Sequence, residues 1–181
     1  ADFQKAYPEV QLDLVLSDDK LDYIQDQIDL GIRIGIPKDD SLIARVLHEE
    51  SLHIYAGAQY LAEHGTPTTV AQLNEHRWVG MSQLPGGFLK QKGHSVQISP
   101  KYRHQSNSPM MIQEMVKAGL GLGVMLPTTV RNEISSGQLI KVMPSLTTEK
   151  VLFSLVYPSR RQVPQRTRVL IDYLMAANIF S

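Results

Sequence analysis

The sequence predicts an α/β fold, because runs of alternating apolar residues are separated by segments with helical spacing. In residues 10–16 apolar side chains recur at every second position, as in a strand with one buried face. Residues 21–28 carry apolar side chains at helical spacing, and residues 30–36 alternate again. A helix between two strands returns the chain in the same direction, so we expect a parallel pair of strands.

Four residues of this first segment are expected near a ligand. Parallel sheets bind ligands at the carboxyl ends of their strands, close to helix N-termini. Ser17 and Asp18 follow the first strand, and Gly35 and Ile36 end the second. A helix cap and a strand end explain the same residues equally well, since every crossover needs a cap.

The remaining elements follow from the same two periodicities. Strands are expected over residues 51–58, 120–127, 139–144 and 151–158, and helices over 58–65, 70–76, 109–119, 128–137 and 166–180. Residues 77–106 have a different sequence pattern, because short expected strands and tight turns follow one another there. We expect this segment to form an antiparallel edge structure.

Composition limits the classes of function. Lys and Arg total 18, and Asp and Glu total 18, so the net charge is zero. A domain that itself holds DNA normally carries a basic excess, and we therefore expect no specific DNA binding by these residues. Cysteine is absent, which excludes disulfides and suits a reducing compartment. Since no apolar run has membrane-spanning length and no signal peptide is visible, we expect a cytoplasmic protein without membrane contact.

Motifs for catalysis and for metal or cofactor binding are incomplete. The group His48, Glu49 and His53 resembles a zinc-protease helix, but histidines at this spacing do not share a helix face. Residues 119–123, GLGLG, lack the last glycine of a dinucleotide fingerprint and follow a helix instead of preceding one. No nucleophile elbow or P-loop is present. We expect no enzyme activity, no cofactor and no bound metal.

The strongest binding signal is the sequence SNSP at residues 106–109. Ser106, Asn107 and Ser108 are small hydrogen-bonding residues before a helix whose first N–H groups lack intrahelical partners. Such a helix start binds anions and other polar ligands. The alternative is a plain N-cap, because caps use the same residue types. Gly121 lies in an expected buried strand, where glycine leaves room for a close backbone or a ligand.

Six segments of the sequence resemble one known family, in the family's order. They are LVLSDDKLDYIQDQIDLGIRIG (14–35), DDSLIARVL (39–47), YLAEHGTPTTVAQLNEHRWVGM (60–81), AGLGLGVMLP (118–127), SGQLIKVMP (136–144) and VYPSRRQVPQRTRVLIDYL (156–174). Together they resemble the effector-binding, or substrate-binding, domain of LysR-type transcriptional regulators. The resemblance extends over nearly the whole chain.

The resemblance implies a two-lobed fold of the periplasmic-binding-protein type 2, with mixed sheets flanked by helices. Lobe I is expected at residues 1–54 plus 154–181, and lobe II at 55–153. Two crossover strands, SLHIYAG and VLFSLVYP, would form the hinge and permit closure over a ligand. The family's winged helix-turn-helix and the first strand of lobe I are expected outside this sequence.

The resemblance also implies a regulator that senses a small effector in a cleft between its lobes. Ser17 would face the helix start at residues 106–108 across that cleft, and the strand from Gly121 to Val124 would form part of the wall. Effector binding would act through differential affinity for two states. The domain would pair with itself as a dimer, and as a tetramer in the full-length protein. DNA would be bound only through the absent N-terminal domain.

Two other classes of protein remain open. A solute-binding protein of a transporter shares the fold, but it would be secreted and monomeric. An enzyme is the weaker alternative, because the sequence has no visible pairing of a nucleophile with a base.

Overall fold

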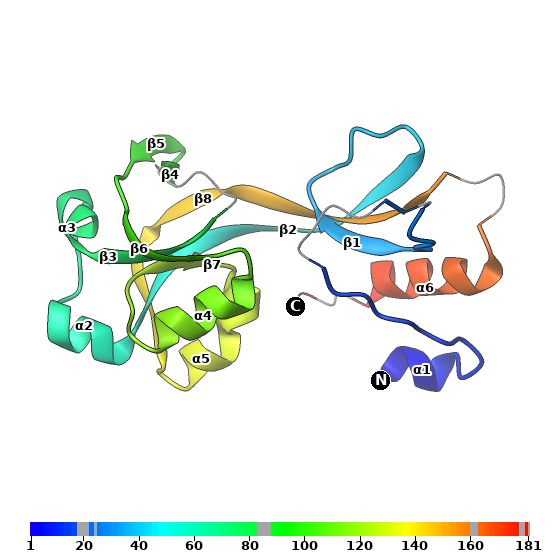
Figure 1. Ribbon diagram of the computed structural model, residues 1–181, viewed down its shortest axis with the longest axis horizontal. Coiled ribbons are helices and arrows are strands. Elements are labelled where there is room, and N and C mark those ends of the chain that lie inside the picture. Colours follow the sequence, from blue (N-terminus) through cyan, green and yellow to red (C-terminus); the bar gives the residue numbers. More distant parts are fainter. Residues whose placement is uncertain (18–21, 24, 83–87, 160–162, 178–179, 181) are drawn as a thin grey trace. The chain divides into compact units, whose positions relative to one another are not determined.

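The computed structural model of the protein describes residues 1–17, 22–23, 25–82, 88–159, 163–177 and 180. Contacts divide the chain into two compact units (Figure 1), of which unit 1 comprises Ala1–Glu49 with Val151–Ser181 and unit 2 comprises Glu50–Lys150. Both divisions fall inside long strands, β2 (Leu42–Gly57) and β8 (Leu139–Pro158). The lobe boundaries expected from the sequence fall within the same two strands.

The remaining elements are short. Unit 1 holds α1 (Asp2–Ala6), β1 (Gly31–Ile34) and α6 (Gln165–Ala176). The helices of unit 2 are α2 (Ala58–His64), α3 (Val70–Glu75), α4 (Pro109–Lys117), the 3-10 helix η1 (Pro127–Val130) and α5 (Arg131–Ser135). Its strands are β3 (Arg77–Met81), β4 (Phe88–Gln91), β5 (His94–Gln97), β6 (Lys101–Ser106) and β7 (Gly123–Met125). In the described part of the chain, no helix is long and apolar enough to cross a membrane.

Strand β8 is central to the larger sheet. The strands of this sheet follow the order β5-β4-β8-β2-β7, and β1 pairs with β8 in addition. Strand β1 lies antiparallel to β8, with Ile32 opposite Leu155 and Ile34 opposite Phe153. Strands β7 and β2 are antiparallel, whereas β3 and β6 form a separate parallel pair. The chain therefore combines a mainly antiparallel sheet with one parallel pair, as a mixed α/β fold requires.

The strand pair expected in residues 10–36 is only partly confirmed. Its second strand exists as β1, but β1 pairs antiparallel with β8 and not parallel with residues 10–16. Residues 10–17 form no strand, and the side chains of Leu14 and Leu16 are 81% and 98% exposed. A strand needs a neighbour for its N–H and C=O groups, and the described residues offer residues 10–16 no ladder.

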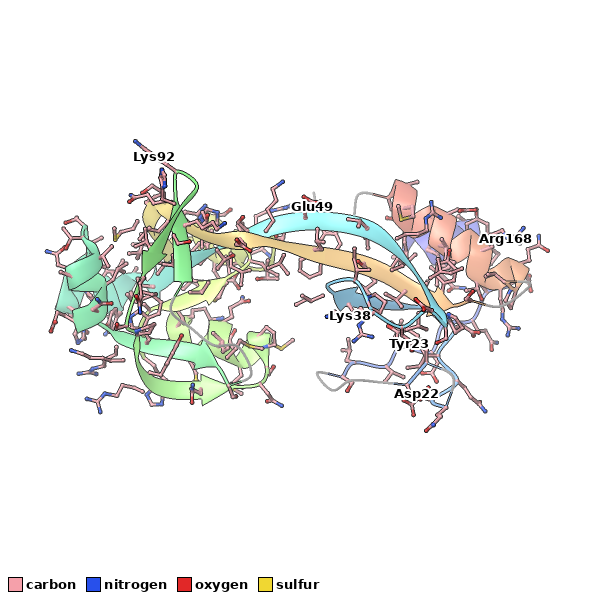
Figure 2. All side chains as sticks on the ribbon, turned by 90° about the horizontal axis from the view of Figure 1, so that it is seen from above. Asp22, Tyr23, Lys38, Glu49, Lys92 and Arg168 are labelled. Atoms are coloured by element: carbon pink, nitrogen blue, oxygen red, sulfur yellow. The ribbon has the colours of Figure 1, made fainter. Side chains whose placement is uncertain are left out.

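The helix expected between these strands is wrong for every residue that the structure describes there. Residues 25–27 form a turn, and Ile28 N–H donates to the Tyr23 carbonyl oxygen at 2.9 Å. Tyr23 is buried beside β1, where a Cβ on Gly31 would overlap its ring (Figure 2). The rest of the expected helix, including Asp18, lies outside the described residues. In the described part of this segment, Tyr23 therefore packs against β1 from a turn and not from a helix.

Residues 77–106 are also only partly as expected. Strands β4 and β5 form the antiparallel hairpin, with Lys92 at its tip (Figure 2). Strands β3 and β6, which were expected in the same antiparallel structure, are parallel to each other. The hairpin lies between them in the sequence, so the chain returns to the start of β3 before β6 begins. The two strands expected at 139–144 and 151–158 are one continuous strand, β8.

Helix boundaries in unit 2 follow the cap signals of the sequence. Helix α2 ends at Gly65, whose φ of 81° suits glycine. Thr69 caps α3 in a capping box, in which Gln72 N–H donates to Thr69 Oγ1 at 3.3 Å and Thr69 N–H donates to Gln72 Oε1 at 3.2 Å. Helix α4 begins at Pro109, as expected.

Among the described residues of unit 2, the buried core forms two apolar clusters. One surrounds Trp78, which is 1% exposed. The other lies against α4 and contains Tyr55, Val79, Ile112, Val116, Met125, Val130 and Leu139. The side chain of Met111, also in α4, is 49% exposed. Successive helical residues are rotated by about 100°, so the residue before Ile112 lies at the margin of the face that Ile112 and Val116 define.

Two histidines of unit 2 flank a buried tyrosine. The Tyr60 hydroxyl accepts a hydrogen bond from Arg77 N–H at 3.2 Å and lies 3.1 Å from His76 Nδ1. The His64 ring stacks on the Tyr60 ring, with 4.3 Å between centroids. Burial lowers the pKa of His76, and the nearby His64 lowers it further. The fold therefore favours the neutral form of His76.

A second polar group is buried on β2. The Tyr55 side chain is fully buried, and its hydroxyl has no hydrogen-bond partner among the described residues. Burial, assisted by Glu50, raises the pKa of Tyr55 to about 12. Burial also lowers the pKa of His53, and Lys141 lowers it further, while Glu50 opposes both effects. Like His76, His53 is therefore favoured in its neutral form.

Gly121 allows a close approach of two backbones. Its φ is 152°, and a Cβ at this position would lie 2.5 Å from the Arg77 carbonyl oxygen. We expect Gly121→Ala to lower the free energy of unfolding by about 1–3 kcal/mol more than Gly137→Ala does, because overpacking adds to backbone strain. Gly137 is a matched control, since its φ is also positive at 73° but a Cβ there meets no atom within 4 Å. Denaturant unfolding of both variants tests this, and equal losses would contradict it.

The two depressed histidine pKa values predict a loss of stability in acid. Unfolded histidine titrates at a pKa of about 6.5, so below that pH the unfolded chain takes up protons that folded His53 and His76 resist. Stability should be fully present above this pH and should fall as the pH drops below it. Thermal melts between about pH 7.5 and 5.5 measure the slope. His76→Gln should reduce the slope, because it removes one of the two histidines whose pKa the fold lowers. An unchanged slope in His76→Gln would refute this assignment.

Candidate functional site

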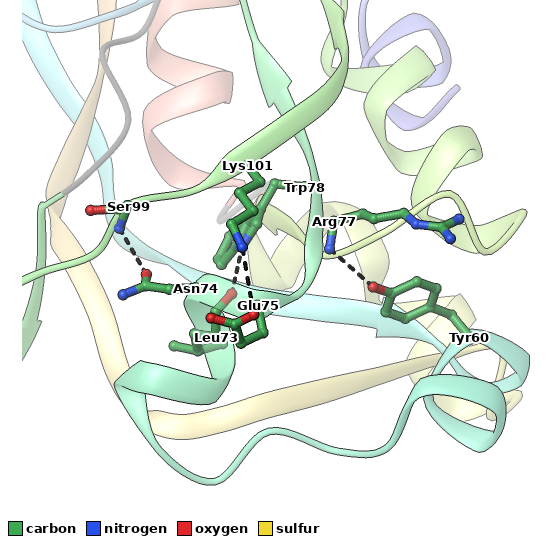
Figure 3. Close-up of polar contacts among 8 residues, drawn as sticks. All are labelled: Tyr60, Leu73, Asn74, Glu75, Arg77, Trp78, Ser99 and Lys101. Atoms are coloured by element: carbon green, nitrogen blue, oxygen red, sulfur yellow. Dashed lines mark hydrogen bonds and ion pairs between the residues drawn. The ribbon is translucent and has the colours of Figure 1, made fainter.

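Helix α3 holds the amino ends of the parallel strands β3 and β6 through hydrogen bonds to two of its residues, Leu73 and Asn74 (Figure 3). Ser99 N–H, just before β6, donates to Asn74 Oδ1 at 2.8 Å. Trp78 Nε1–H, in β3, donates to the Leu73 carbonyl oxygen at 3.0 Å, and this bond is buried. Both contacts join α3 to the same end of the parallel pair. The opposite ends of the two strands are therefore left for other contacts.

The carboxyl ends of β3 and β6 lie side by side. Met81, the last residue of β3, is opposite Ser106, the last residue of β6. Ser82 N–H donates to the Ser106 carbonyl oxygen at 3.0 Å, so the pairing continues one residue beyond the strand. The Tyr102 ring covers Gly80 near this end, and burial raises the pKa of the Tyr102 phenol. This is the edge at which parallel strands present ligand-binding groups.

Helix α4 begins directly after this edge with free N–H groups. Ser108 is its N-cap residue, but the Ser108 side chain makes no capping hydrogen bond. Ser108 N–H donates instead to Ser106 Oγ at 3.0 Å. Pro109 has no N–H, and the N–H groups of Met110 and Met111 have no acceptor among the described residues. The start of α4 therefore carries unsatisfied donors and the positive end of a helix dipole.

The start of α4 carries both polar and apolar side chains. Asn107 is exposed, and no acidic residue occupies the first turn of α4. The side chains of Met110 and Met111 are 74% and 49% exposed. A ligand here would meet N–H and amide donors together with flexible apolar side chains. Among the described residues, no group of three or more His, Asp or Glu is placed to hold a metal ion.

The expected site residues of the first segment all belong to unit 1. Ser17 is exposed in a stretch without regular structure, and Asp18 lies outside the described residues. Gly35 follows β1 with a φ of 80°, and a Cβ there would meet no atom within 4 Å. Ile36 is 57% exposed. Their role in ligand binding stays a prediction.

Gly121 and Val124 occupy different surroundings from Ser106. Gly121 packs against the backbone of Arg77, at the first residue of β3, whereas Ser106 lies beside the last residue of that strand. Val124 is opposite Ile54 of β2 and packs against the cluster around Trp78. Gly121 therefore lies beside the start of β3, and Val124 lies in β7 beside β2. Contact of either residue with a ligand stays a prediction.

Sequence reasoning did not single out Met81 and Ser82, which share the strand edge with Ser106. The available signal was the apolar run of residues 78–81 followed by a small polar residue. That pattern marks the end of a buried strand, but it gains meaning only once β3 is known to be parallel to β6. The same holds for Met110, because the helical spacing of apolar residues alone does not show whether its side chain is exposed or belongs to the core.

The sequence matches the family described as LysR substrate binding domain over residues 1–178. The transcriptional regulator CrgA of Neisseria meningitidis (serogroup C, strain 8013) is 31% identical over 179 residues, which cover 96% of this chain and 59% of CrgA. The transcriptional activator AaeR of Escherichia coli K12 is 29% identical over 173 residues, which cover 94% of this chain and 56% of AaeR. The chain thus spans less than two thirds of the length of these relatives.

The solved structures agree with the sequence matches. The structure of the regulatory domain of CrgA from Neisseria meningitidis has a TM-score of 0.83 to this chain at 30% identity, and the match covers 97% of this chain and 88% of that one. This likeness confirms the expected α/β fold of the periplasmic-binding-protein type 2. Because the family match covers almost the whole sequence, the chain belongs to the LysR substrate-binding domain family.

Proposed function

We propose that this chain is the ligand-sensing domain of a cytoplasmic LysR-type transcription regulator. We also propose that a small polar or anionic effector binds at the start of α4. The family match and the regulators among its relatives support the first part. The observation that supports the second part is the uncapped helix start, where the N–H groups of Met110 and Met111 have no acceptor among the described residues.

The chemistry of this helix start selects the effector class. Unsatisfied N–H groups and the helix dipole attract a carboxylate, a phosphate or another strong acceptor. Asn107 and Ser108 add side-chain donors at the same place, and the first turn of α4 has no acidic side chain to repel an anion. The exposed methionine side chains of Met110 and Met111 suit an apolar part of the same molecule. An anionic head with an apolar body fits these groups best.

A sensing role requires that the effector bind two states of the protein with different affinity. The difference in binding free energy is the coupling that reaches the DNA-binding part of the full-length regulator. Self-association as a dimer, and as a tetramer at full length, stays a prediction from the family. So does the cleft between lobes as the place where the effector is enclosed.

The transporter alternative receives no support from the relatives. CrgA and AaeR are transcriptional regulators, and the CrgA regulatory domain has the same fold as this chain. Catalysis also lacks a supporting feature at the start of α4, where the groups are donors of hydrogen bonds and apolar side chains. A sensing domain accounts for these groups without any chemical step.

The effector site can be tested with two alanine variants. Thermal shifts with a panel of small carboxylates and inorganic phosphate identify a binding anion, which calorimetry then titrates. We expect Ser106→Ala and Asn107→Ala each to weaken its binding by about 0.5–1.5 kcal/mol, the value of one hydrogen bond. Asn132→Ala, at an exposed position of α5 in the same unit, should leave the affinity unchanged. Parent affinity in both site variants would refute the proposed position.

We expect the 181-residue chain by itself to bind no DNA sequence specifically. Its 18 basic residues are matched by 18 acidic ones, whereas DNA affinity comes mostly from basic groups that neutralise phosphates. Fluorescence anisotropy with a duplex carrying the operator, at about 100 mM salt, measures this without much weak electrostatic binding. The full-length regulator is the positive control. Tight, sequence-dependent binding by the chain alone would contradict the proposed division of roles.

A further inference from the structure

Two of the seven methionines lie at the start of α4 and are exposed to solvent. The side chain of Met110 is 74% exposed and that of Met111 is 49% exposed. The other methionines are buried or partly buried, namely Met81, Met115, Met125, Met143 and Met175. The chain has no cysteine, so no thiol competes with these thioethers for an oxidant. Exposure therefore singles out the side chains of Met110 and Met111 as those that an oxidant in solution reaches first.

The two methionines occupy the second and third positions of a helix whose first N–H groups are free. Pro109 is the first residue of α4, so Met111 is the third. The N–H groups of Asn107, Met110 and Met111 have no acceptor among the described residues. A thioether sulfur is only a weak acceptor of hydrogen bonds. The unmodified methionine side chains are therefore poor partners for these donors.

Helix α3 shows what an oxygen at the third position of a helix does in this protein. Gln72 is the third residue of α3, and its Oε1 accepts from Thr68 N–H at 2.7 Å and from Thr69 N–H at 3.2 Å. The corresponding N–H groups at the start of α4 belong to Asn107 and Ser108. Oxidation of methionine places an oxygen on Sδ, as far along the side chain as Oε1 on Cδ of glutamine. A sulfoxide at the third position of α4 therefore carries the acceptor that a capping box uses.

We propose that Met110 and Met111 form an oxidation site for a peroxide, and that the sulfoxide of Met111 caps α4 as Gln72 caps α3. The sulfur lone pair attacks one peroxide oxygen, so that an S–O bond forms and the O–O bond breaks. The sulfide loses two electrons and becomes a sulfoxide. Hydrogen peroxide gains them and is reduced to water, which keeps both hydrogen atoms. Methionine sulfoxide reductases reverse the change, so the site can act as a switch.

Oxidation would also weaken the binding of an anion at the start of α4. This consequence rests on the proposed function, because the sulfoxide oxygen carries partial negative charge among the N–H groups that would bind the anion. A peroxide would thereby set the sensitivity of the domain to its effector. The oxidation and the capping bond themselves do not depend on whether an effector binds there.

The oxidation site is tested by peptide mass mapping after brief exposure of the protein to hydrogen peroxide. We expect Met110 and Met111 to be oxidised at least about tenfold faster than Met115 and Met125, because reaction follows exposure. Met115 lies in the same helix and packs against the apolar cluster that contains Met125, so both are internal controls. Equal rates for the four methionines would overturn the proposal.

The capping bond is tested with glutamine variants, since glutamine carries the oxygen without an oxidant. Met111→Gln should raise the Tm by about 2–4 °C, the effect of one helix cap in a chain of this size. Met110→Gln is the matched control, because it makes the same chemical change one position away from the place that Gln72 holds in α3. It should raise the Tm by less than about 1 °C. Equal Tm values for the two variants, or a Met111→Gln variant below the parent, would overturn the capping bond.

Calorimetry with the carboxylate or phosphate that the thermal-shift panel identifies separates this inference from the proposed function. Treatment with peroxide should weaken its binding about tenfold in the parent, the value of one hydrogen bond. The same treatment should not change the affinity of a Met110→Leu/Met111→Leu double variant, which cannot form either sulfoxide. An equal loss in both proteins would overturn the proposed switch. A parent that binds no anion before oxidation would contradict the proposed function, while the mass mapping and the Tm values would still decide the oxidation site and its cap.

Discussion

The pairing of β8 with three other strands is the constraint on which the sheet depends. Within unit 2, β8 places Leu146 opposite Gln91 of β4, and within unit 1 it places Leu155 opposite Ile32 of β1. Leu146 and Leu155 are fully buried. A shift of one residue in the register of β8 would turn both side chains to the opposite face, so the register is strongly specified. The same strand also pairs with β2, and the division between the two units falls within both strands.

The candidate site depends on a second pairing, the parallel register of β3 and β6. Parallel strands bring their carboxyl ends together, so Met81 and Ser106 meet although the hairpin of β4 and β5 separates them in the sequence. Contacts from α3 occupy the opposite ends, where Trp78 Nε1–H donates to the Leu73 carbonyl oxygen. The contacts from α3 and the free donors of α4 thus lie at different ends of one strand pair. The free donors at the start of α4 are left without a partner because the residues that could cap them bond to each other.

The sequence allowed correct predictions where the structure depends on local signals. The helices α2, α3 and α4 begin and end at caps such as Thr69 and Gly65, which act within one turn. The polar stretch Ser106 to Ser108 was identified for the same reason, because it precedes a helix. The parallel pairing of β3 with β6 was missed, since alternation of apolar residues says which face is buried but not which strand lies alongside. The close contact of Gly121 with Arg77 was visible only as a glycine in a buried strand.

Residues 10–16 show the same limit of the sequence prediction, because here a strand was expected that the structure does not have. Their alternation is the clearest strand signal in the sequence, yet the structure has no strand there and Leu16 is almost fully exposed. Natural sequences usually agree with their folds at the local and the global level, so a conflict of this kind has a cause. In β1 the strand propensity of the sequence agrees with the structure, because Ile32 and Ile34 lie in the expected strand, paired with β8 on one side. What residues 10–16 and the outer edge of β1 have in common is a ladder that the described residues leave unfilled.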